Sequence, residues 1–405
     1  MRTALLAAYR TSAEGVLRAE LPLAQRPVLL WQAALARDLG CRRILILSER
    51  ASPAISALAE ECRMQGLAFQ RLARFADLAA LLHAEDELCI IADGLLPDRA
   101  AVRALLAPGG ADKPLRKAVL CLPDGDPLAA RFPEDFERID AARCWAGVLT
   151  MRSAPAQALG DFPSDSNPVS LLLRMALQSG TNCHTLAPSD RGREAWLLAS
   201  EARVLAAEEQ ALIERHRTPP VWSAPGAALA GRLAEAIGTR GLRAGEPSAM
   251  LAGVLLMIAA LVLASQGFPV AAIIGAATAS LSLELAAQFA RLQVAVLDEA
   301  GGGWLAALRD PGRDVLAALA GMLALAPPLG VSATAALAPL AVGLARLAAR
   351  EAGPARAAFW QDRSLHLALL ALAAGFGALG AGFAVLGLGA LAVLLFTRRG
   401  QPAPQ

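Results

Sequence analysis

Two neighbouring apolar runs decide the class of this protein: MLAGVLLMIAALVLASQ (residues 250–266) and VAAIIGAATASLSLELAAQF (residues 270–289). A helix needs about 20 predominantly apolar residues to cross the hydrocarbon core of a bilayer. Only Gly267, Phe268 and Pro269 separate the runs, and glycine next to proline is typical of a tight turn. The stretch therefore predicts a helical hairpin in a membrane.

Four further apolar runs follow at residues 315–332, 333–347, 365–379 and 383–396. We expect an all-α polytopic bundle of about six transmembrane helices over residues 249–399, with a short tail at 400–405. Arginines gather between the second and third runs, between the fourth and fifth, and after the sixth, whereas the opposite loops contain no Lys or Arg. Because positively charged loops stay in the cytoplasm, the pattern predicts a multi-pass protein of the inner (cytoplasmic) membrane with both termini cytoplasmic.

The first half of the chain has a different composition, with charged residues every few positions up to about residue 243. A length of 405 residues favours two domains. The net charge of +2 gives no reason to expect a nucleic-acid partner. All six cysteines lie in this half without a C-x-x-C pair, so we interpret them as buried apolar residues in a reducing compartment and expect no metal site from them.

Short apolar runs alternate with amphipathic stretches over residues 1–216. RILIL (residues 43–47), LCIIA (88–92) and AVLCL (118–122) read as strands, as does the start of the chain at residues 3–8. Residues 28–39 and 54–64 read as helices. This alternation predicts a cytoplasmic α/β domain with a mostly parallel sheet. Residues 217–248 would form an interfacial linker, with an amphipathic stretch at 227–237 lying along the inner membrane surface.

Asp93 directly follows the predicted strand at residues 88–92. In open α/β sheets, ligands bind beyond the carboxyl ends of the strands, where a carboxylate commonly holds a metal or a nucleotide. Asp93-Gly94 is also an ordinary turn dipeptide. Both interpretations remain open from the local sequence.

The second apolar run carries two polar residues, Glu284 and Gln288, one helical turn apart, with Arg291 three positions further on. Charge within a membrane span is rare and often functional. One interpretation is therefore a polar site near the cytoplasmic face. The other is an Arg–Glu pair that holds helices together.

The order of these parts resembles one family. LSLELAAQFARL (residues 281–292) and GGWLAALRD (residues 302–310) resemble the D-x2-D-G-x2-A-R and G-x3-D-x3-D signature of CDP-alcohol phosphatidyltransferases. With the preceding α/β domain, which looks like a GT-A-like sugar nucleotidyltransferase, the chain is similar to the bifunctional inositol-phosphate cytidylyltransferase/di-inositol-phosphate-phosphate synthase. The signature positions are occupied by Leu283, Ala286, Ala287, Ala290, Arg291, Gly302, Ala306 and Asp310.

The resemblance implies a site whose chemistry is largely missing. In the family, the Asp cluster holds divalent cations that neutralise the diphosphate of a CDP-linked donor, and the last Asp is the proposed base, here Asp310. Leu283, Ala286 and Ala306 replace the other acids, and side chains without oxygen cannot bind Mg²⁺ or Mn²⁺. We therefore expect no bound cofactor. Arg291, Gly302 and Glu284 remain candidates for substrate binding.

The α/β half departs from the family in the same way. Its first strand leads into residues 9–14 without the Gly-rich phosphate loop. Arg26-Pro27 resembles the family's K-P element with Arg in place of Lys. Asp93 lies where the family's metal-binding Asp after a central strand would fall, which makes it a further candidate for substrate binding.

Two functions follow from these expectations. We favour a catalytically degenerate relative, a scaffold or regulatory partner in envelope-lipid or polyol-phosphate metabolism. The alternative is an active CDP-alcohol phosphotransferase that uses displaced acids with Mg²⁺ or Mn²⁺. A transporter is disfavoured because no span carries a paired intramembrane charge network. Expected partners are the lipid bilayer, a CDP-linked donor, and a second copy of the chain or an active transferase. The displaced acids would be Glu284, Asp298, Glu299 or Asp314, together with Asp310.

Overall fold

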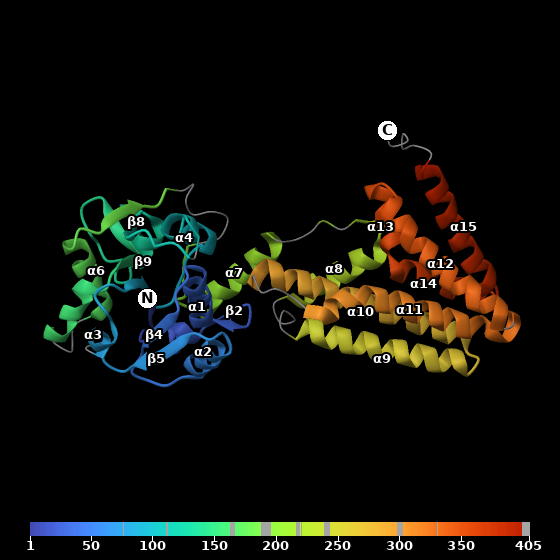
Figure 1. The fold of residues 1–405 in the computed structure, drawn as a ribbon, viewed down its shortest axis with the longest axis horizontal. Helices are drawn as coiled ribbons and strands as arrows, with labels where there is room; N and C mark the ends of the chain where they lie inside the picture. The colour runs from blue at the N-terminus through green and yellow to red at the C-terminus, as the bar shows by residue number, and fades with distance from the viewer. Residues whose placement is uncertain are drawn as a thin grey trace. The chain divides into compact units, whose positions relative to one another are not determined.

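The computed structural model describes residues 1–75, 77–110, 112–162, 167–187, 196–215, 219, 221–238, 244–297, 303–329 and 331–398. The chain forms two compact units, Met1–Glu209 and Gln210–Gln405. The first unit combines strands and helices, and the second is helical (Figure 1).

The first unit is built on a seven-stranded sheet in the order β10-β8-β9-β6-β1-β4-β5. Neighbouring strands are parallel except at β9, which runs antiparallel to both β6 and β8. The predicted mostly parallel sheet is therefore confirmed. The strands are β1 (Arg2–Ala7), β4 (Arg43–Leu47), β5 (Ala68–Leu72), β6 (Glu87–Ile91), β8 (Ala118–Pro123), β9 (Arg143–Arg152) and β10 (Asn182–Thr185), with the short pairs β2 (Pro22–Leu23) and β3 (Arg26–Pro27), and β7 (Leu95–Leu96) and β11 (Leu197–Leu198).

Helices cover both faces of this sheet because successive strand side chains point to opposite sides. In β1, Ala4 and Leu6 enter one buried cluster, and Leu5 and Ala7 enter the other. The first cluster includes residues of α1, α2 and α4, and the second includes residues of η2, α3 and α6. The helices of this part are η1 (Arg18–Glu20), α1 (Val28–Asp38), α2 (Pro53–Met64), α3 (Asp77–Leu81), α4 (Arg99–Leu106), α5 (Pro127–Arg131), η2 (Ala154–Asp161) and α6 (Pro168–Gln178). The helix α7 (Ala202–Arg215) begins in this unit and ends beyond Glu209.

Local capping chemistry sets where two of these helices begin. The Ser52 hydroxyl accepts the Ile55 N–H at the start of α2, and Asn167 accepts two backbone N–H groups at the start of α6. A proline follows each cap in the first turn, where its missing N–H is not needed. The cap of α6 fixes Asn167 beside the site described below.

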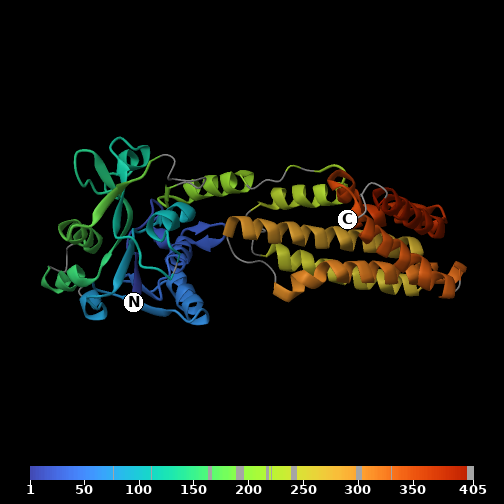
Figure 2. The same cartoon turned by 45° about the horizontal axis from the view of Figure 1, so that its top comes forward.

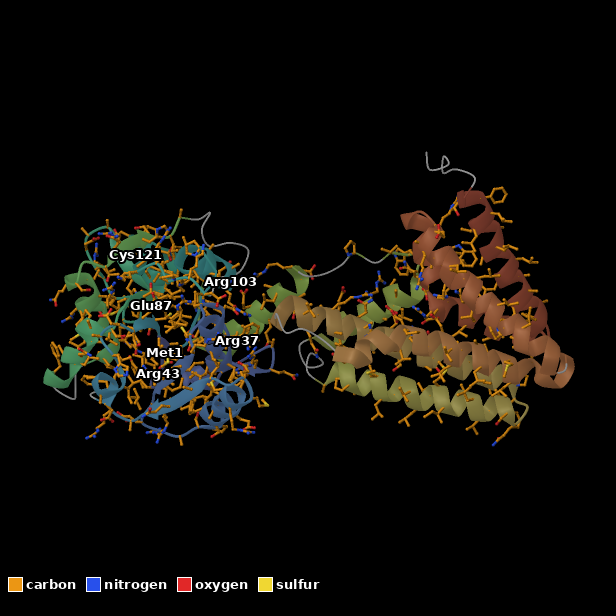
Figure 3. All side chains as sticks on the ribbon, in the orientation of Figure 1. Met1, Arg37, Arg43, Glu87, Arg103 and Cys121 are labelled. Carbon is orange, nitrogen blue, oxygen red and sulfur yellow. The ribbon has the colours of Figure 1, made fainter. Side chains whose placement is uncertain are left out.

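The amino edge of the sheet is closed by ion pairs. The amine of Met1 lies 2.6 Å from Asp86, and Arg43 lies 3.2 Å from the same carboxylate. Arg2 pairs with Glu87 at 2.7 Å. Figure 3 labels Met1, Arg43 and Glu87, which lie near one another in this part of the unit.

In the second unit, the described residues of all six predicted apolar runs are mainly helical. In the described residues, α9, Pro269–Ala295 of α10 and Leu379–Thr397 of α15 are long and apolar enough to cross a membrane. The helix α14 is apolar but shorter, so the six-span topology and its orientation stay predictions. The helices are α8 (Pro225–Ile237), α9 (Gly245–Ser265), α10 (Pro269–Leu297), α11 (Gly303–Leu329), α12 (Val331–Glu351), α13 (Pro354–Gln361), α14 (Arg363–Gly375) and α15 (Leu379–Arg398).

Glycine allows α9 and α10 to pack closely along their length, as Figures 1 and 2 both show. A Cβ added to Gly253 would lie 2.6 Å from Leu283, and one on Gly245 would lie 2.8 Å from Phe289. The helix α9 exposes large apolar side chains, among them Leu251 and Ile258. Apolar groups on the outside of a helical bundle fit a lipid environment.

Candidate functional site

A cavity lies at the carboxyl edge of the sheet in the first unit. It encloses about 460 Å³, counting the part open to solvent. Tyr9 and Arg10 follow β1, Asp93 follows β6, and Trp145 lies at the beginning of β9. These segments meet because β1 and β6 end at the same edge and the antiparallel β9 begins there. The remaining lining residues are Ala92, Leu95, Glu134, Asp135, Phe136, Glu137, Asn167, Val169, Ser170 and Leu198.

Asp93 is the most buried charged residue of this cavity, with 5% of its surface exposed. Its Oδ2 accepts the backbone N–H of Tyr9 at 2.7 Å and that of Arg10 at 2.6 Å. Its Oδ1 is buried and has no hydrogen-bond partner. Asp93 therefore ties the loop after β1 to the end of β6 with one oxygen and leaves the other free.

Burial raises the pKa of Asp93 to about 6, because removal from water disfavours the charged form. The two backbone N–H groups and the nearby Arg18 and Arg10 oppose this effect by stabilising the carboxylate. At neutral pH the side chain is therefore mostly ionised. An ionised, buried oxygen without a partner is rare in folded proteins and calls for a donor.

The two arginines near Asp93 already share another carboxylate. Arg10 and Arg18 approach the same oxygen of Asp135 at 2.5 and 2.7 Å. Arg10 also donates to the Glu134 carbonyl at 3.1 Å. Glu137, on the same loop, lies 3.5 Å from Arg174. The cations around the cavity are thus bound to internal acids.

Gly94 allows Arg18 to reach this position. Its φ of +70° is favourable only for glycine, and an added Cβ would lie 2.9 Å from the Cβ of Arg18. The sequence identified Asp93 but missed Asp135, Arg18 and Asn167. Asn167 had a signal, since Asn-Pro before an apolar helical run is typical of a helix start. Asp135 and Arg18 carry no comparable local signal.

Arg26, which resembled the K-P element, lies outside this cavity. It is almost fully buried, pairs with Glu61 at 3.0 Å and lies over the Trp31 ring. The structure therefore places it in the packing between η1, α1 and α2.

A second group of charged residues joins four helices of the second unit. Arg313 of α11 is 3% exposed and lies 3.1 Å from Glu284 of α10. The same guanidinium donates to the carbonyl oxygen and the hydroxyl of Ser280 at 2.7 and 2.9 Å. Gln288 donates to Glu284 at 3.4 Å. The polar face of α10 is therefore Ser280, Glu284 and Gln288, and it points to α11.

Asp314 of α11 forms further ion pairs of this group, with arginines of α12 and α14. Arg363 of α14 donates to both of its oxygens, at 2.8 and 2.9 Å, in a bidentate pair. Arg346 of α12 lies 3.6 Å from the same carboxylate and 3.0 Å from Nδ1 of His366. A guanidinium can only donate, so Nδ1 accepts and the ring is neutral with its proton on Nε2.

We call these residues the arginine–carboxylate network: Glu284, Asp310, Arg313, Asp314, Arg346 and Arg363. It borders a cavity that is otherwise lined mainly by apolar side chains, with about 380 Å³ of empty space when the part open to solvent is counted. Its three acids and three arginines balance in formal charge. Buried N–H groups remain without partners on Arg313, Arg346 and His366. Of the six members, α11 contributes three, and α10, α12 and α14 contribute one each. Only Glu284 and Arg346 lie within the predicted apolar runs and they are not paired with each other, so the expectation that no span carries a paired charge network stays a prediction.

Asp310, the candidate base, is the most exposed acid of the network. Its side chain is 54% exposed, and it lies 3.5 Å from Arg313 and 3.8 Å from Arg363. Arg291 is exposed and forms no ion pair with another described residue, so the proposed Arg291–Glu284 pair is not formed. Glu284 pairs instead with Arg313 on α11, a helix that follows later in the sequence. Gly302, Asp298 and Glu299 lie outside the described residues.

The replaced signature positions on α10 hold apolar side chains that are packed inside the bundle. Leu283, Ala286 and Ala287 are all buried, and Leu283 packs against Gly253 of α9. Ala306 is in the first turns of α11. Apolar packing has thus taken over the face on which the resemblance places the acids.

The residues present do not fit a divalent cation. Among the described parts of the chain, no three His, Cys, Asp or Glu side chains gather closely enough to hold one. Mg²⁺ and Mn²⁺ need several oxygen ligands. The oxygens of Asp314 are taken by Arg363, and Glu284 is taken by Arg313. A cation here would have to displace arginines.

No protein-family model matches the sequence, and no curated protein matches it. Among solved structures, the inositol-1-phosphate CTP transferase from T. maritima is similar to this chain. The two are 12% identical, the match covers 52% of this chain and 96% of that protein, and the TM-score is 0.34. A likeness this weak carries no argument about activity.

Proposed function

We propose that this protein is a membrane-anchored, catalytically degenerate relative of CDP-alcohol phosphotransferases, acting as a scaffold or regulatory partner in envelope-lipid or polyol-phosphate metabolism. The observation that carries the proposal is the arginine–carboxylate network. Each described acid near the expected signature faces an arginine at 3.8 Å or less.

The physical argument concerns charge. A site for two divalent cations needs a surplus of negative charge before the metals arrive. Here three arginines balance three acids. Removing one partner of a buried pair typically destabilises a protein by about 3–5 kcal/mol, so metal entry would work against the fold. The network therefore holds α10, α11, α12 and α14 together.

The proposal includes the organisation expected from the sequence. Residues 1–216 would be a cytoplasmic nucleotidyltransferase-like domain, 217–248 an interfacial linker, and 249–399 the domain in the inner membrane. The three helices long and apolar enough to cross a bilayer support membrane association. A second copy of the chain, or an active transferase, would be the protein partner.

Binding of CDP-diacylglycerol by the full-length protein in detergent micelles tests this proposal. We expect calorimetry to detect no binding that depends on Mg²⁺ or Mn²⁺, because the described acids near the signature are paired with arginines and do not gather into a metal site that could neutralise the diphosphate. Asp310→Ala should behave as wild type in the same titration.

The alternative, an active phosphotransferase with displaced ligands, predicts the opposite. Its support is the exposure of Asp310 beside the network. Metal-dependent binding that disappears in Asp310→Ala, with an unchanged melting temperature, would establish the enzyme and refute the degenerate function. Glu246→Gln is a matched control, since this acid begins α9 outside the network.

A further inference from the structure

The free oxygen of Asp93 gives the cavity of the first unit a chemical preference. Asp93 lines that cavity, is 95% shielded from solvent, and has one carboxylate oxygen with no donor. A carboxylate oxygen can only accept a hydrogen bond. The missing partner is therefore a donor, and a positively charged donor would be bound more strongly than a neutral one.

The charge of the residues that line the cavity also favours a cationic ligand. Asp93, Glu134, Asp135 and Glu137 face one cationic lining residue, Arg10. Arg18 and Arg174 approach from outside the lining and pair with Asp135 and Glu137. With these two included, the acids still exceed the bases by one.

Aromatic side chains form part of the same wall. Tyr9, Phe136 and Trp145 line the cavity, and both Phe136 and Trp145 are nearly fully buried. An aromatic lining combined with a carboxylate favours an organic ligand with a cationic group, through dispersion and charge.

Two other ligand classes fit less well. A divalent cation needs several oxygens, and Asp93 offers one, because its other oxygen holds the N–H groups of Tyr9 and Arg10. A phosphate group would need unpaired cations, but Arg10 is already bound to Asp135. Arg18 has an unpartnered Nε, yet Arg18 does not line the cavity.

We therefore propose that the cavity at the carboxyl edge of the sheet binds a small organic cation, a primary ammonium compound whose N–H group donates to Oδ1 of Asp93. The ligand class is opposite in charge to the nucleotide that the family resemblance would imply. The inference rests on the first unit alone and does not depend on the proposed function.

Ethanolamine hydrochloride is the probe, titrated into the full-length protein in detergent and followed by calorimetry at pH 7.5. Ethylene glycol has a similar size and a hydroxyl in place of the ammonium group. We expect ethanolamine to bind at least about tenfold more tightly, since a hydrogen bond between charged groups contributes about 1.5–3 kcal/mol.

Asp93→Asn should abolish this preference while keeping the shape of the site, because the amide oxygen can still accept from Tyr9 and Arg10. Asp124→Asn is the matched control. Asp124 is 58% exposed, lies outside the cavity, and should leave binding unchanged.

Wild-type binding at pH 5 provides a second readout if Asp93→Asn does not fold. The charged groups around Asp93 are Arg10, Arg18 and Asp135, with Glu134 and Glu137 in the same lining, and the nearby Tyr9 hydroxyl is neutral. None of the arginines titrates in this range. With a pKa of about 6, Asp93 is mostly protonated at pH 5, so affinity should fall about tenfold.

Three results would overturn the inference: equal binding of ethylene glycol and ethanolamine, unchanged binding in Asp93→Asn, or binding of Mg²⁺ without binding of ethanolamine. The last would identify a metal site. Each can occur whether or not CDP-diacylglycerol binds, so this test and that of the proposed function fail separately.

Discussion

The cavity of the first unit and the network of the second use the same kinds of side chain with different results. In the network, Arg363 holds both oxygens of Asp314, and Arg313 holds Glu284, so each acid faces an internal cation. In the cavity, the loop amides hold only one oxygen of Asp93. Charge compensated within the fold supports structure, and charge left uncompensated beside an open space indicates binding. The amino edge of the same sheet resembles the network in this respect, because its acid Asp86 is paired with the Met1 amine and with Arg43.

Removing one network cation should give the largest effect. Arg313→Met leaves the partly buried Glu284 without its ion pair and leaves the Ser280 carbonyl without this donor. We expect a loss of about 3–5 kcal/mol in the free energy of unfolding. Denaturant unfolding in detergent, followed by circular dichroism, measures it.

Two companion variants sharpen this test. Arg291→Gln alters an exposed arginine on α10 and should leave stability nearly unchanged. Adding Glu284→Gln to Arg313→Met should restore part of the loss, because the unpaired charge is then removed. If Arg313→Met is as stable as wild type, the network is not structural and its arginines are free for ligands.

Neutralising Asp93 should raise the free energy of unfolding, by less than Arg313→Met lowers it. Its folded-state pKa of about 6 exceeds the ordinary value of 3.8, so the folded state binds more protons than the unfolded state between these values. The contribution of Asp93 to the free energy of unfolding is therefore most favourable below pH 4, and this contribution is lost as the pH rises through 6. The loss approaches about 3 kcal/mol.

Asp93→Asn should remove this dependence and stabilise the first unit at pH 7. Hydrogen exchange of the amides in β1 and β6 across pH 4.5–7.5, in the full-length protein, reports on that unit. A wild-type protein whose β1 protection does not fall with rising pH, relative to the variant, would show that Asp93 is not strained by burial. It would also weaken the contrast between the two regions.

The smallest effect concerns the turn that positions Arg18. Gly94→Ala adds a Cβ at 2.9 Å from Arg18 in a left-handed conformation, whereas Gly15→Ala has the same strain with open space around it. Each should lose about 1 kcal/mol from backbone strain. We expect Gly94→Ala to lose about 1 kcal/mol more, from the contact with Arg18. Equal melting temperatures for the two variants would mean that Arg18 moves freely and does not help to shape the cavity.

Much of the architecture was readable from local patterns. The strands at residues 43–47, 88–92 and 118–122 form as predicted, as do the helices at 28–39 and 54–64. Their buried positions recur with the period of the backbone, so the pattern is visible within a few residues. The six apolar runs are helices for the same reason, although three of them meet the length and hydropathy needed to span a bilayer.

Local sequence patterns did not predict which charged residues form ion pairs with one another. Glu284 was expected to interact with Arg291, seven residues away, yet it pairs with Arg313, 29 residues away on another helix. Helical periodicity shows which face a residue occupies but not which helix that face will meet. The placement of the signature at Leu283 and Ala286 had the same weakness, since both side chains are buried and Leu283 packs on α9.

The sequence by itself determined the two classes of structure, four of the seven strands of the large sheet, and the position of Asp93 at the end of a strand, because each depends on neighbouring residues. Only the tertiary structure decided which charges are compensated. Asp93 meets the amides of Tyr9 and Arg10 across more than 80 residues, and Arg10 and Arg18 meet Asp135 across more than 110. Electrostatic energy depends on distance and burial in space, which no local pattern contains.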